Sequence, residues 1–510
     1  MALLRELLLL TFACLASSPC SVSTSNITDY LVLMSFKSHV SMDPSGALVQ
    51  WGNMSVPMCQ WPGVACSLNG SRLGRVVALN LTMLNLVGTI TPALGNLTYL
   101  RVLDLSWNHF HGILPPELGN LRDLEYLILQ INSIQGYIPP SLANCSHLVS
   151  ILLDTNELQG EIPGEFISLH NLKYLYLNRN RLTGKIPSSI GSLVSLEELV
   201  LQYNNLTGEI PTQIGGIVNL TRLSLGVNQL TGTIPVSLGN LSALTILSLL
   251  ENKLKGSIPP LQGLSSLGVL QLGRNKLEGT IPPWLGNLSS LGVLHLGGNK
   301  LEGTIPPWLG NLSSLVSIDL QGNSLVGQIP ESLGNLELLT TLSLSSNKLS
   351  GSIPHSIRNL DSLTGLYLNY NELEGSMPQS MFNLSSLEIL SIDYNNLTGV
   401  LPIDMYSKLS KLKTFIISVN QFHGMLPSSI CNASRLQQIE ISGTLISGTI
   451  PQCLGTHQMN LSIVVFAGSE FEATNDADWS FMSSLTNCTN MRQLSLPSNK
   501  LKVCATKFNC

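Results

Sequence analysis

Few residues in this sequence have the spacing that catalysis or metal binding requires. The patterns Gly-x-Ser-x-Gly, His-Glu-x-x-His and Gly-x-x-x-x-Gly-Lys-Ser/Thr are all absent. His109 and His111 flank Phe110, but the sequence indicates no third metal ligand for them. Asp476 and Asp478 lie in a loop, where a structural turn explains them better than a catalytic pair. We therefore expect no catalytic residue, metal or cofactor, and no enzyme activity in this chain.

Aromatic and polar residues occur instead where they could bind another molecule. Tyrosine combines a large contact area with a polar tip and is common in recognition hot spots. Strand alternation predicts that two groups of such side chains face solvent: Trp107, Tyr126, Tyr174, Tyr176, Arg179, Gln202 and Tyr203, and then Tyr367, Tyr370, Asp393 and Tyr394. We expect Tyr174, Tyr176 and Tyr203 to form one exposed patch. The alternative is that tyrosine simply suits β-strands.

These side chains are carried by a repeat of 24 residues that recurs from about residue 76 to residue 501. Its consensus is L-x-x-L-x-L-x-x-N-x-L-x-G-x-I-P-x-x-L-G-N-L, the period and pattern of a leucine-rich repeat. The sequence thus predicts an α/β leucine-rich-repeat solenoid. It would be a curved right-handed superhelix with a parallel β-sheet on its concave face, plant-type L-x-G-x-I-P turns and short helices on its convex side.

The consensus asparagine has a predicted structural role, because its amide can satisfy backbone groups freed at the end of each strand. It occupies the same slot in successive coils, for example at Asn108, Asn132 and Asn156, whereas Leu84 and Thr444 replace it. The glycine of the pattern permits a positive φ, and the proline suits a turn. Residues 275–291 and 299–315 are identical, which indicates duplication of one coil, and residues 475–488 form an insertion.

The sequence divides into five segments by composition and repeat pattern. We expect a signal peptide at residues 1–24, a helical N-terminal cap at 25–70, regular repeats at 71–452, irregular repeats at 453–501 and a truncated non-repeat tail at 502–510. Cys59 and Cys66 are predicted to form a disulfide that holds Trp51 and Trp61 over the first coil. Closing that loop would contribute about 2.5 kcal/mol. Cys145 and Cys488 suit small buried thiols, and the pairing of Cys431, Cys453, Cys504 and Cys510 stays open.

Export is also predicted by the density of N-x-S/T glycosylation sequons. We expect glycans on Asn26, Asn53, Asn69, Asn96, Asn205, Asn219, Asn240, Asn287, Asn311, Asn383, Asn396, Asn432 and Asn460. Charged residues make up only 11% of the chain and the net charge is −5, so nucleic acid is not an expected partner. After the signal peptide no apolar stretch has the ~20 residues that a membrane span needs. The chain as written is predicted to be secreted.

The N-terminal segment resembles the cap of plant leucine-rich-repeat receptor kinases. The resemblance rests on Asp29, the Phe-Lys and Asp-Pro pairs, Trp51 and the motif C-x-W-x-G-V-x-C at 59–66. The phrase D-W-x-F-x-x-S-L-x-N-C at 478–488 is similar to that of the immune group of these kinases, which includes the rice bacterial-blight receptor and the elongation-factor receptor. The resemblance implies a glycosylated extracellular sensor of a microbial peptide or protein. It also implies a co-receptor kinase as partner and a location at the outer side of the plasma membrane.

This sequence departs from that plan after Leu501, where the repeat pattern is lost and neither a membrane helix nor a kinase follows. Our first hypothesis is therefore the ligand-recognition region of such a receptor, truncated before the membrane helix. The alternative is a secreted decoy, or an inhibitor of a microbial enzyme. Because the last coil has no successor to cover it, we expect association and fraying beyond about Cys453.

Overall fold

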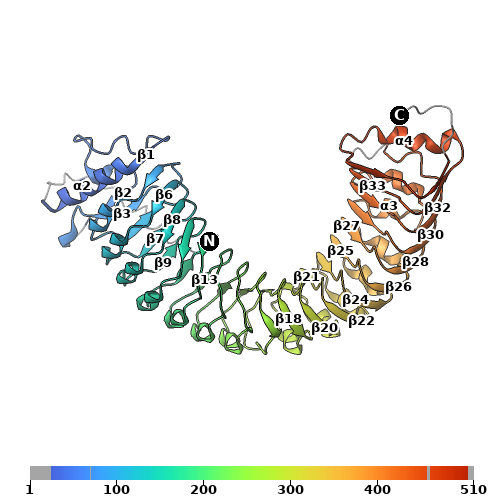
Figure 1. Ribbon diagram of the computed structural model, residues 1–510, viewed down its shortest axis with the longest axis horizontal. Helices are drawn as coiled ribbons and strands as arrows, with labels where there is room; N and C mark the ends of the chain where they lie inside the picture. Colours follow the sequence, from blue (N-terminus) through green and yellow to red (C-terminus); the bar gives the residue numbers. More distant parts are fainter. Residues whose placement is uncertain (1–23, 69, 456–459, 503–510) are drawn as a thin grey trace. The chain divides into compact units, whose positions relative to one another are not determined.

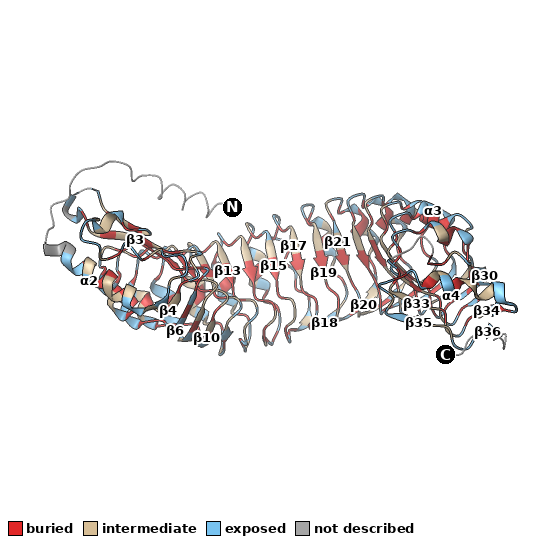
Figure 2. Ribbon diagram, turned by 90° about the horizontal axis from the view of Figure 1, so that it is seen from above, coloured by how far each residue is buried: buried red, intermediate tan, exposed pale blue. Residues whose placement is uncertain are grey.

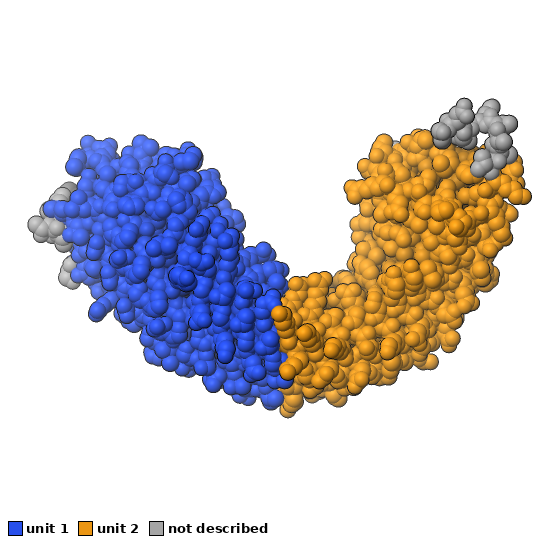
Figure 3. All heavy atoms as spheres, viewed as in Figure 1, with its two compact units in different colours: residues 1–244 blue, residues 245–510 orange. Residues whose placement is uncertain are grey.

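The computed structural model describes residues 24–68, 70–455 and 460–502 (Figure 1). It consists of two compact units, unit 1 at Met1–Leu244 and unit 2 at Thr245–Cys510 (Figure 3). The predicted signal peptide lies outside the described residues except for Thr24, and so do Cys504, Cys510 and the tail beyond Lys502. Each unit is a leucine-rich-repeat solenoid, so the predicted fold class is confirmed.

The Leu-x-Leu segments of unit 1 form a sheet that we call its inner sheet. Neighbouring strands are parallel and in register one coil apart, as in Tyr174↔Glu198, except for an antiparallel first pair. Side chains therefore alternate between the core and the inner face. The strands are β2 Val64–Cys66, β3 Val76–Asn80, β5 Val102–Asp104, β7 Tyr126–Ile128, β9 Ser150–Leu152, β11 Tyr174–Tyr176, β13 Glu198–Val200 and β14 Arg222–Ser224.

Unit 2 has an inner sheet of the same kind, and all of its strand pairs are parallel. The strands are β15 Ile246–Ser248, β17 Val269–Gln271, β19 Val293–His295, β21 Ser317–Asp319, β23 Thr341–Ser343, β25 Gly365–Tyr367, β27 Ile389–Ser391, β29 Thr414–Ile416, β31 Gln438–Glu440, β33 Ile463–Val465 and β35 Gln493–Ser495.

Each unit also has an outer sheet, which the sequence analysis did not predict. It forms where the segment after the ladder asparagine extends as far as the consensus glycine and pairs with the next coil. In unit 1 it contains β1 Val40–Met42, β4 Val87–Thr89, β6 His109–Ile113, β8 Ser133–Tyr137, β10 Glu157–Gly160 and β12 Arg181–Leu182. In unit 2 it contains β16 Lys255–Ser257, β18 Lys276–Gly279, β20 Lys300–Thr304, β22 Ser324–Gly327, β24 Lys348–Gly351, β26 Glu372–Ser376, β28 Asn396–Val400, β30 Gln421–Met425, β32 Leu445–Gly448, β34 Glu470–Ala473 and β36 Lys500–Leu501.

The predicted short helices are 3-10 turns on the side of each coil away from the inner sheet (Figure 1). In most coils a proline directly precedes the turn, as Pro211 does for η8, since its fixed φ suits that position. In unit 1 they are η3 Pro92–Asn96, η4 Pro116–Asn120, η5 Pro140–Asn144, η6 Gly164–Ser168, η7 Ser188–Ser192, η8 Thr212–Gly216 and η9 Val236–Asn240. In unit 2 they are η10 Pro283–Asn287, η11 Pro307–Asn311, η12 Glu331–Asn335, η13 His355–Asn359, η14 Gln379–Asn383 and η15 Ser428–Asn432.

The core of each coil is a stack of leucines and isoleucines closed by the asparagine ladder. Buried residues run along the strands of the inner sheets, as in β17 and β19 (Figure 2). Leu175 on β11 is fully buried, and burying one such side chain contributes about 1.5–3 kcal/mol. Asn156 is typical of the ladder: its Oδ1 accepts from the N–H of Ile134 at 3.0 Å, and its Nδ2 donates to the carbonyls of Leu129 and Leu153. The predicted structural role of the ladder is confirmed.

The residue before the ladder asparagine has a left-handed backbone in many coils. Trp107, Arg179 and Tyr203 have φ between 55° and 58°, and so do β-branched residues such as Ile131 (φ 57°). Their N–H groups donate to the next coil, as Arg179 does to the carbonyl of Gln202 at 3.0 Å. The turn that ends each inner strand thus imposes a conformation that costs a non-glycine residue about 1–2 kcal/mol.

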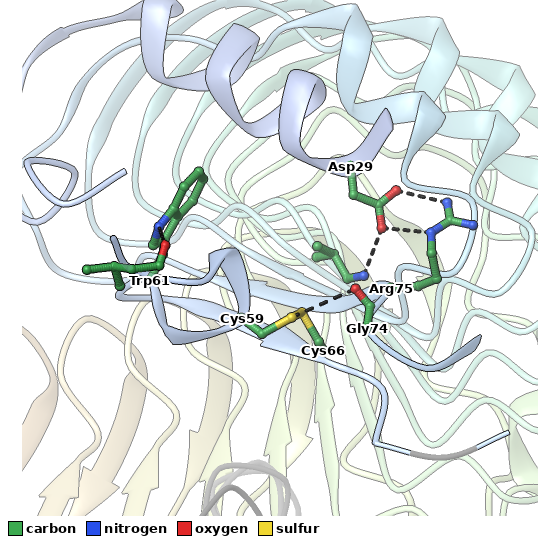
Figure 4. Close-up of a disulfide and its surroundings, with 8 residues drawn as sticks. Asp29, Cys59, Trp61, Cys66, Gly74 and Arg75 are labelled. Atoms are coloured by element: carbon green, nitrogen blue, oxygen red, sulfur yellow. Dashed lines mark hydrogen bonds and ion pairs between the residues drawn. A yellow bond between two sulfur atoms is a disulfide. The ribbon is translucent and has the colours of Figure 1, made fainter. Parts of the chain in front are cut away.

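The N-terminal cap is built on helix α2 Thr24–His39, with the short turns η1 Met58–Gln60 and η2 Gly70–Arg72. Asp29 is buried and receives two hydrogen bonds from Arg75, at 2.8 and 2.9 Å, and one from the N–H of Val76 (Figure 4). The predicted Cys59–Cys66 disulfide is present, with Cα atoms 5.4 Å apart.

Two buried tryptophans complete the cap. Trp51 and Trp61 stack with centroids 5.6 Å apart, and their indole N–H groups donate to the carbonyls of Pro62 and Val56. The disulfide closes the loop that carries Trp61, as the sequence predicted (Figure 4).

The last coils of unit 2 are less regular. Cys431 and Cys453 form a second disulfide, which the sequence had left open, and Cys145 and Cys488 are buried, as predicted. Helix α3 Met405–Lys408 replaces a 3-10 turn, and the insertion folds as η16 Asp476–Trp479 and α4 Ser480–Leu485. Asp478 caps η16 by accepting from the N–H groups of Thr474 and Asn475, so its role is structural. No helix in the described ranges is long and apolar enough to cross a bilayer.

Candidate ligand-binding face

A polar part of the inner face of unit 1 lies on β11, β13 and β14. The hydroxyl of Tyr174 donates to Glu197 at 3.0 Å, and that of Tyr176 donates to Glu198 at 2.5 Å. Arg222 pairs with the same carboxylate of Glu198 at 2.9 Å. The two tyrosines are therefore half-buried and held by hydrogen bonds.

Beside them, Tyr203 is 42% exposed, and the Arg179 guanidinium lies 4.5 Å from the centre of its ring. Such a cation–π contact contributes about 0.5–1 kcal/mol at an exposed site and fixes both side chains. Of the three tyrosines predicted to form one exposed patch, only Tyr203 is exposed. Tyr174 and Tyr176 lie on the same face but are tied to glutamates.

Besides Oγ of Ser150, two buried oxygen atoms at equivalent positions of neighbouring coils have no hydrogen-bond partner among the described residues. They are Oδ1 of Asp154 and Oδ1 of Asn178, and both are buried. The residues occupy the same slot on neighbouring coils, where the N–H of Thr155 donates to the carbonyl of Asn178 at 2.9 Å. Leaving a buried acceptor unpaired costs about 1–3 kcal/mol.

The ionisation of Asp154 reflects the same environment. Burial raises the pKa of Asp154 to about 6, although the hydroxyl of Thr155 and the charge of Arg179 act to lower it. Burial and the hydrogen bond to Glu198 likewise raise the pKa of Tyr176, so its hydroxyl stays protonated. The sequence analysis missed Asp154, although its slot is that of Asn178 and Gln202 in the next two coils. We call Asp154, Tyr176, Asn178, Arg179, Glu198 and Tyr203 the unit 1 cluster.

The other residues predicted in unit 1 border this cluster. Trp107 is 48% exposed at the end of β5, and Tyr126 on β7 is half-buried beside Ser150 of β9. Gln202 is also half-buried, and it occupies the same position as Asn178 in the next coil. All three lie on the inner face, but within the described residues no hydrogen bond or ring contact joins Trp107 to the cluster.

In unit 2 the structure brings two predicted residues together and corrects a third. Tyr370 and Tyr394 are 49% and 45% exposed and stack with centroids 4.3 Å apart, while Tyr367 on β25 is half-buried. Asp393 is only 8% exposed, contrary to its predicted solvent-facing position. Its carboxylate accepts from the Ser391 hydroxyl at 2.7 Å, and burial raises its pKa. An outward strand position can thus be covered by its neighbours.

Most glycosylation sequons lie outside these clusters in the sequence, although Asn205 and Asn396 come two residues after Tyr203 and Tyr394. The asparagines of the Gly-Asn-Leu-Ser/Thr segments end the 3-10 turns and are exposed, as are Asn53, Asn205, Asn219, Asn396, Asn432 and Asn460. The side chains of Asn26 and Asn69 lie outside the described residues. Glycans at these sites stay a prediction. In the described part of the chain no group of three or more His, Cys, Asp or Glu side chains could hold a metal.

Comparisons with known protein families agree with this architecture. Residues 275–495 match the family described as leucine-rich repeat region, and residues 26–67 match the leucine-rich-repeat N-terminal domain. Three further segments, 99–121, 146–206 and 219–241, match leucine-rich repeats. The receptor-like serine/threonine-protein kinase EFR of Arabidopsis thaliana is 44% identical over 86 residues. That alignment covers 17% of this chain and 8% of the kinase.

Solved receptor structures match over most of the chain. The plant peptide hormone receptor RGFR1, in complex with RGF2, has a TM-score of 0.78 and 32% identity, covering 87% of this chain and 72% of its own. The Arabidopsis receptor kinase HAESA, in complex with the peptide hormone IDA and the co-receptor SERK1, has a TM-score of 0.73 and 29% identity. That match covers 93% of this chain and 86% of the HAESA chain.

Proposed function

This chain belongs to the family of leucine-rich-repeat receptor-kinase ectodomains, and from that premise we propose that its inner face binds an extended peptide or protein segment. The unit 1 cluster would receive a donor-bearing group of that ligand, such as a lysine or arginine side chain or a terminal ammonium. The observation that carries the proposal is the pair of buried, unpaired oxygens on Asp154 and Asn178.

The chemistry of the cluster favours a cation over an anion. Both unpaired atoms are acceptors, and Glu198 already has Arg222 and Tyr176 as partners. An ammonium or guanidinium that displaced the side chains covering these two oxygens would satisfy both of them and form a charge-assisted hydrogen bond with Asp154, about twice as strong as a neutral one. Tyr203, with Arg179 on its ring, would supply contact area beside it.

The resemblance to the immune group extends the proposal to plant defence and a ligand of microbial origin, supported by the match to EFR over 86 residues. Because HAESA was solved with a co-receptor, we also propose a co-receptor kinase as a partner of this chain. The location would be the extracellular side of the plasma membrane, or the apoplast if the chain is secreted as a decoy. Grafting residues 25–502 onto the membrane helix and kinase of EFR, and recording a defence response to microbial extracts, tests the immune role. No response to any extract, from a chimera that reaches the cell surface, would count against it.

The binding proposal is tested by panning the secreted protein against a phage library of random linear peptides. We expect enriched peptides to share a lysine or arginine. We expect Asp154→Asn to reduce their recovery about tenfold or more, since removing a buried charge pair costs at least ~1.4 kcal/mol. The triple alanine variant of Tyr174, Tyr176 and Tyr203 should abolish it.

Matched controls lie on other faces of unit 1. Glu165→Gln on η6 removes an exposed acid, and Tyr137→Phe removes a hydroxyl from a 68% exposed tyrosine on β8 of the outer sheet. Both should retain the recovery seen with the wild type. Failure of the wild type to enrich any peptide, or equal recovery by the triple alanine variant, would refute the proposal.

A further inference from the structure

The two duplicated coils of unit 2 carry the same unusual pair of residues on their 3-10 turns. Trp284 and Asn287 lie on η10, and Trp308 and Asn311 lie at the same positions of η11. In the other 3-10 turns of this kind the tryptophan position holds a small or polar residue, most often serine. Both asparagines begin an Asn-Leu-Ser sequon. Each duplicated coil therefore places an indole and a glycosylation sequon on one short turn.

The spacing of three residues brings each indole beside its sequon. A 3-10 helix has three residues per turn, so the side chains at i and i+3 are eclipsed. Trp284 and Asn287 have this spacing, and Trp284 is half-buried whereas Asn287 is exposed. The Nε1 atom of Trp284 is buried, so the accessible part of its ring is carbon. The first sugar of a glycan on Asn287 would thus begin next to an apolar aromatic surface.

A second indole reaches the same sequon from the next coil. A Cβ added to Gly286, the residue before Asn287, would lie 3.2 Å from Cε3 and 3.3 Å from Cδ2 of Trp308. At Gly310, the same position of η11, an added Cβ would instead clash with the backbone carbonyl oxygen of Ser332 in the following coil. The half-buried ring of Trp308 therefore lies against η10 at a position where the next pair of turns packs backbone against backbone.

The turn η10 also has a neighbouring 3-10 turn on one side only. The described coil before it, residues 252–275, contains no such turn, so within unit 2 its neighbour is η11 alone. Packing by itself would account for an apolar residue at the tryptophan position. However, Nε1 of Trp284 has no hydrogen-bond partner among the described residues, and an unpaired buried donor lowers stability. A phenylalanine or leucine would fill the same space without that loss.

The chemistry of an N-linked glycan suits this surface. Its first sugar is N-acetylglucosamine, whose pyranose ring presents C–H bonds on its faces. A sugar face that packs on an aromatic face removes apolar surface of both from water. We propose that the first sugar of a glycan on Asn287 packs against the indoles of Trp284 and Trp308 and thereby stabilises η10. This inference rests on the predicted glycosylation of Asn287 and is independent of the proposed ligand.

Native-state hydrogen exchange at η10 tests the coupling between the glycan and the indoles. The N–H of Leu288 closes this turn by donating to the carbonyl of Leu285 at 3.1 Å. Glycopeptide mass spectrometry first measures the occupancy of Asn287 in the secreted full-length chain. We expect Asn287→Gln to reduce protection of the Leu288 amide about fivefold. In a Trp308→Ser background the same substitution should change it by less than about twofold, and this double-mutant cycle cancels the packing lost with the indole.

Two further variants and one matched sequon control the experiment. Trp308→Phe keeps an aromatic face and should retain most of the effect of the glycan. Trp308→Leu keeps apolar bulk without an aromatic face, so it should behave like Trp308→Ser even if the serine variant folds poorly. In η9, Ser237 takes the tryptophan position before the sequon at Asn240. Asn240→Gln should therefore change protection of the Leu241 amide, which donates to Leu238 at 3.2 Å, by less than about twofold.

Three results would overturn the inference. The first is a secreted chain that carries no glycan on Asn287. The second is an equal loss of protection on Asn287→Gln in the wild-type, Trp308→Ser and Trp308→Leu backgrounds, which would give the indoles a packing role alone. The third is an unchanged Leu288 amide on loss of the glycan together with increased protection on addition of diacetylchitobiose, which would show that the indoles serve a free sugar instead.

Discussion

Replacing one asparagine in the middle of the ladder should lower the free energy of unfolding by less than its number of hydrogen bonds suggests. Asn156 serves the carbonyls of Leu129 and Leu153, but Asn132 also donates to Leu129 and Asn180 also donates to Leu153, at 3.1 and 3.0 Å. Asn156→Ala therefore leaves mainly the N–H of Ile134 without a partner. An unpaired buried donor costs about 1–3 kcal/mol, so we expect a loss of about 2 kcal/mol.

The first ladder position lacks this redundancy. Because Leu84 occupies the preceding slot, Asn108 is the only ladder asparagine that donates to Leu81, at 2.7 Å, and it also accepts from the N–H groups of Leu84 and Leu86. Asn108→Ala would leave three backbone groups without a hydrogen-bond partner, instead of one. We expect it to cost about 2 kcal/mol more than Asn156→Ala.

Native-state hydrogen exchange on the secreted protein measures both effects locally. A loss of about 2 kcal/mol should speed exchange of the Ile134 amide roughly thirtyfold in the Asn156→Ala variant. Asn156→Thr should protect Ile134 no better than Asn156→Ala does, because Thr444 in the same slot donates to the carbonyl of Ile441 in its own coil at 3.1 Å, and the corresponding carbonyl of Leu153 is already served by Asn180. If the Asn108→Ala and Asn156→Ala variants lost the same free energy of unfolding, or if protection of the Ile134 amide were unchanged, the sharing of carbonyls between neighbouring asparagines would not explain their contributions to stability.

Two further predictions concern individual sites in unit 1. Val227 has a φ of 53°, a left-handed conformation that asparagine adopts more easily than valine. Val227→Asn should therefore stabilise the protein by about 1 kcal/mol and raise its melting temperature. A melting temperature below that of the wild type would contradict the strain argument. The folded pKa of Asp154 lies above its ordinary value of 3.8, so its contribution to stability is greatest below about pH 4 and is lost as the pH rises through about 6. Asp154→Asn should flatten this part of the stability–pH curve, and identical curves for variant and wild type would refute the assignment.

The repeat pattern by itself determined the solenoid, because leucine burial and the asparagine ladder are local and recur in every coil. It located the inner strands, the cap, the Cys59–Cys66 disulfide and the inner-face position of the tyrosines, all of which follow from spacing within one or two coils. The family could also be read from motifs that lie close together in the sequence, as the cap motif at 59–66 does.

Only the tertiary structure decided what neighbouring coils do to one another. The outer sheets depend on pairing between segments about one repeat apart, and no single coil signals them. Asp393 is buried and Tyr176 is tied to Glu198 because side chains from adjacent strands cover and bond them. Asp154 and Asn178 emerged as unpaired acceptors for the same reason. Strand alternation fixes the face on which a side chain lies, whereas its exposure and its partners depend on the coils to either side.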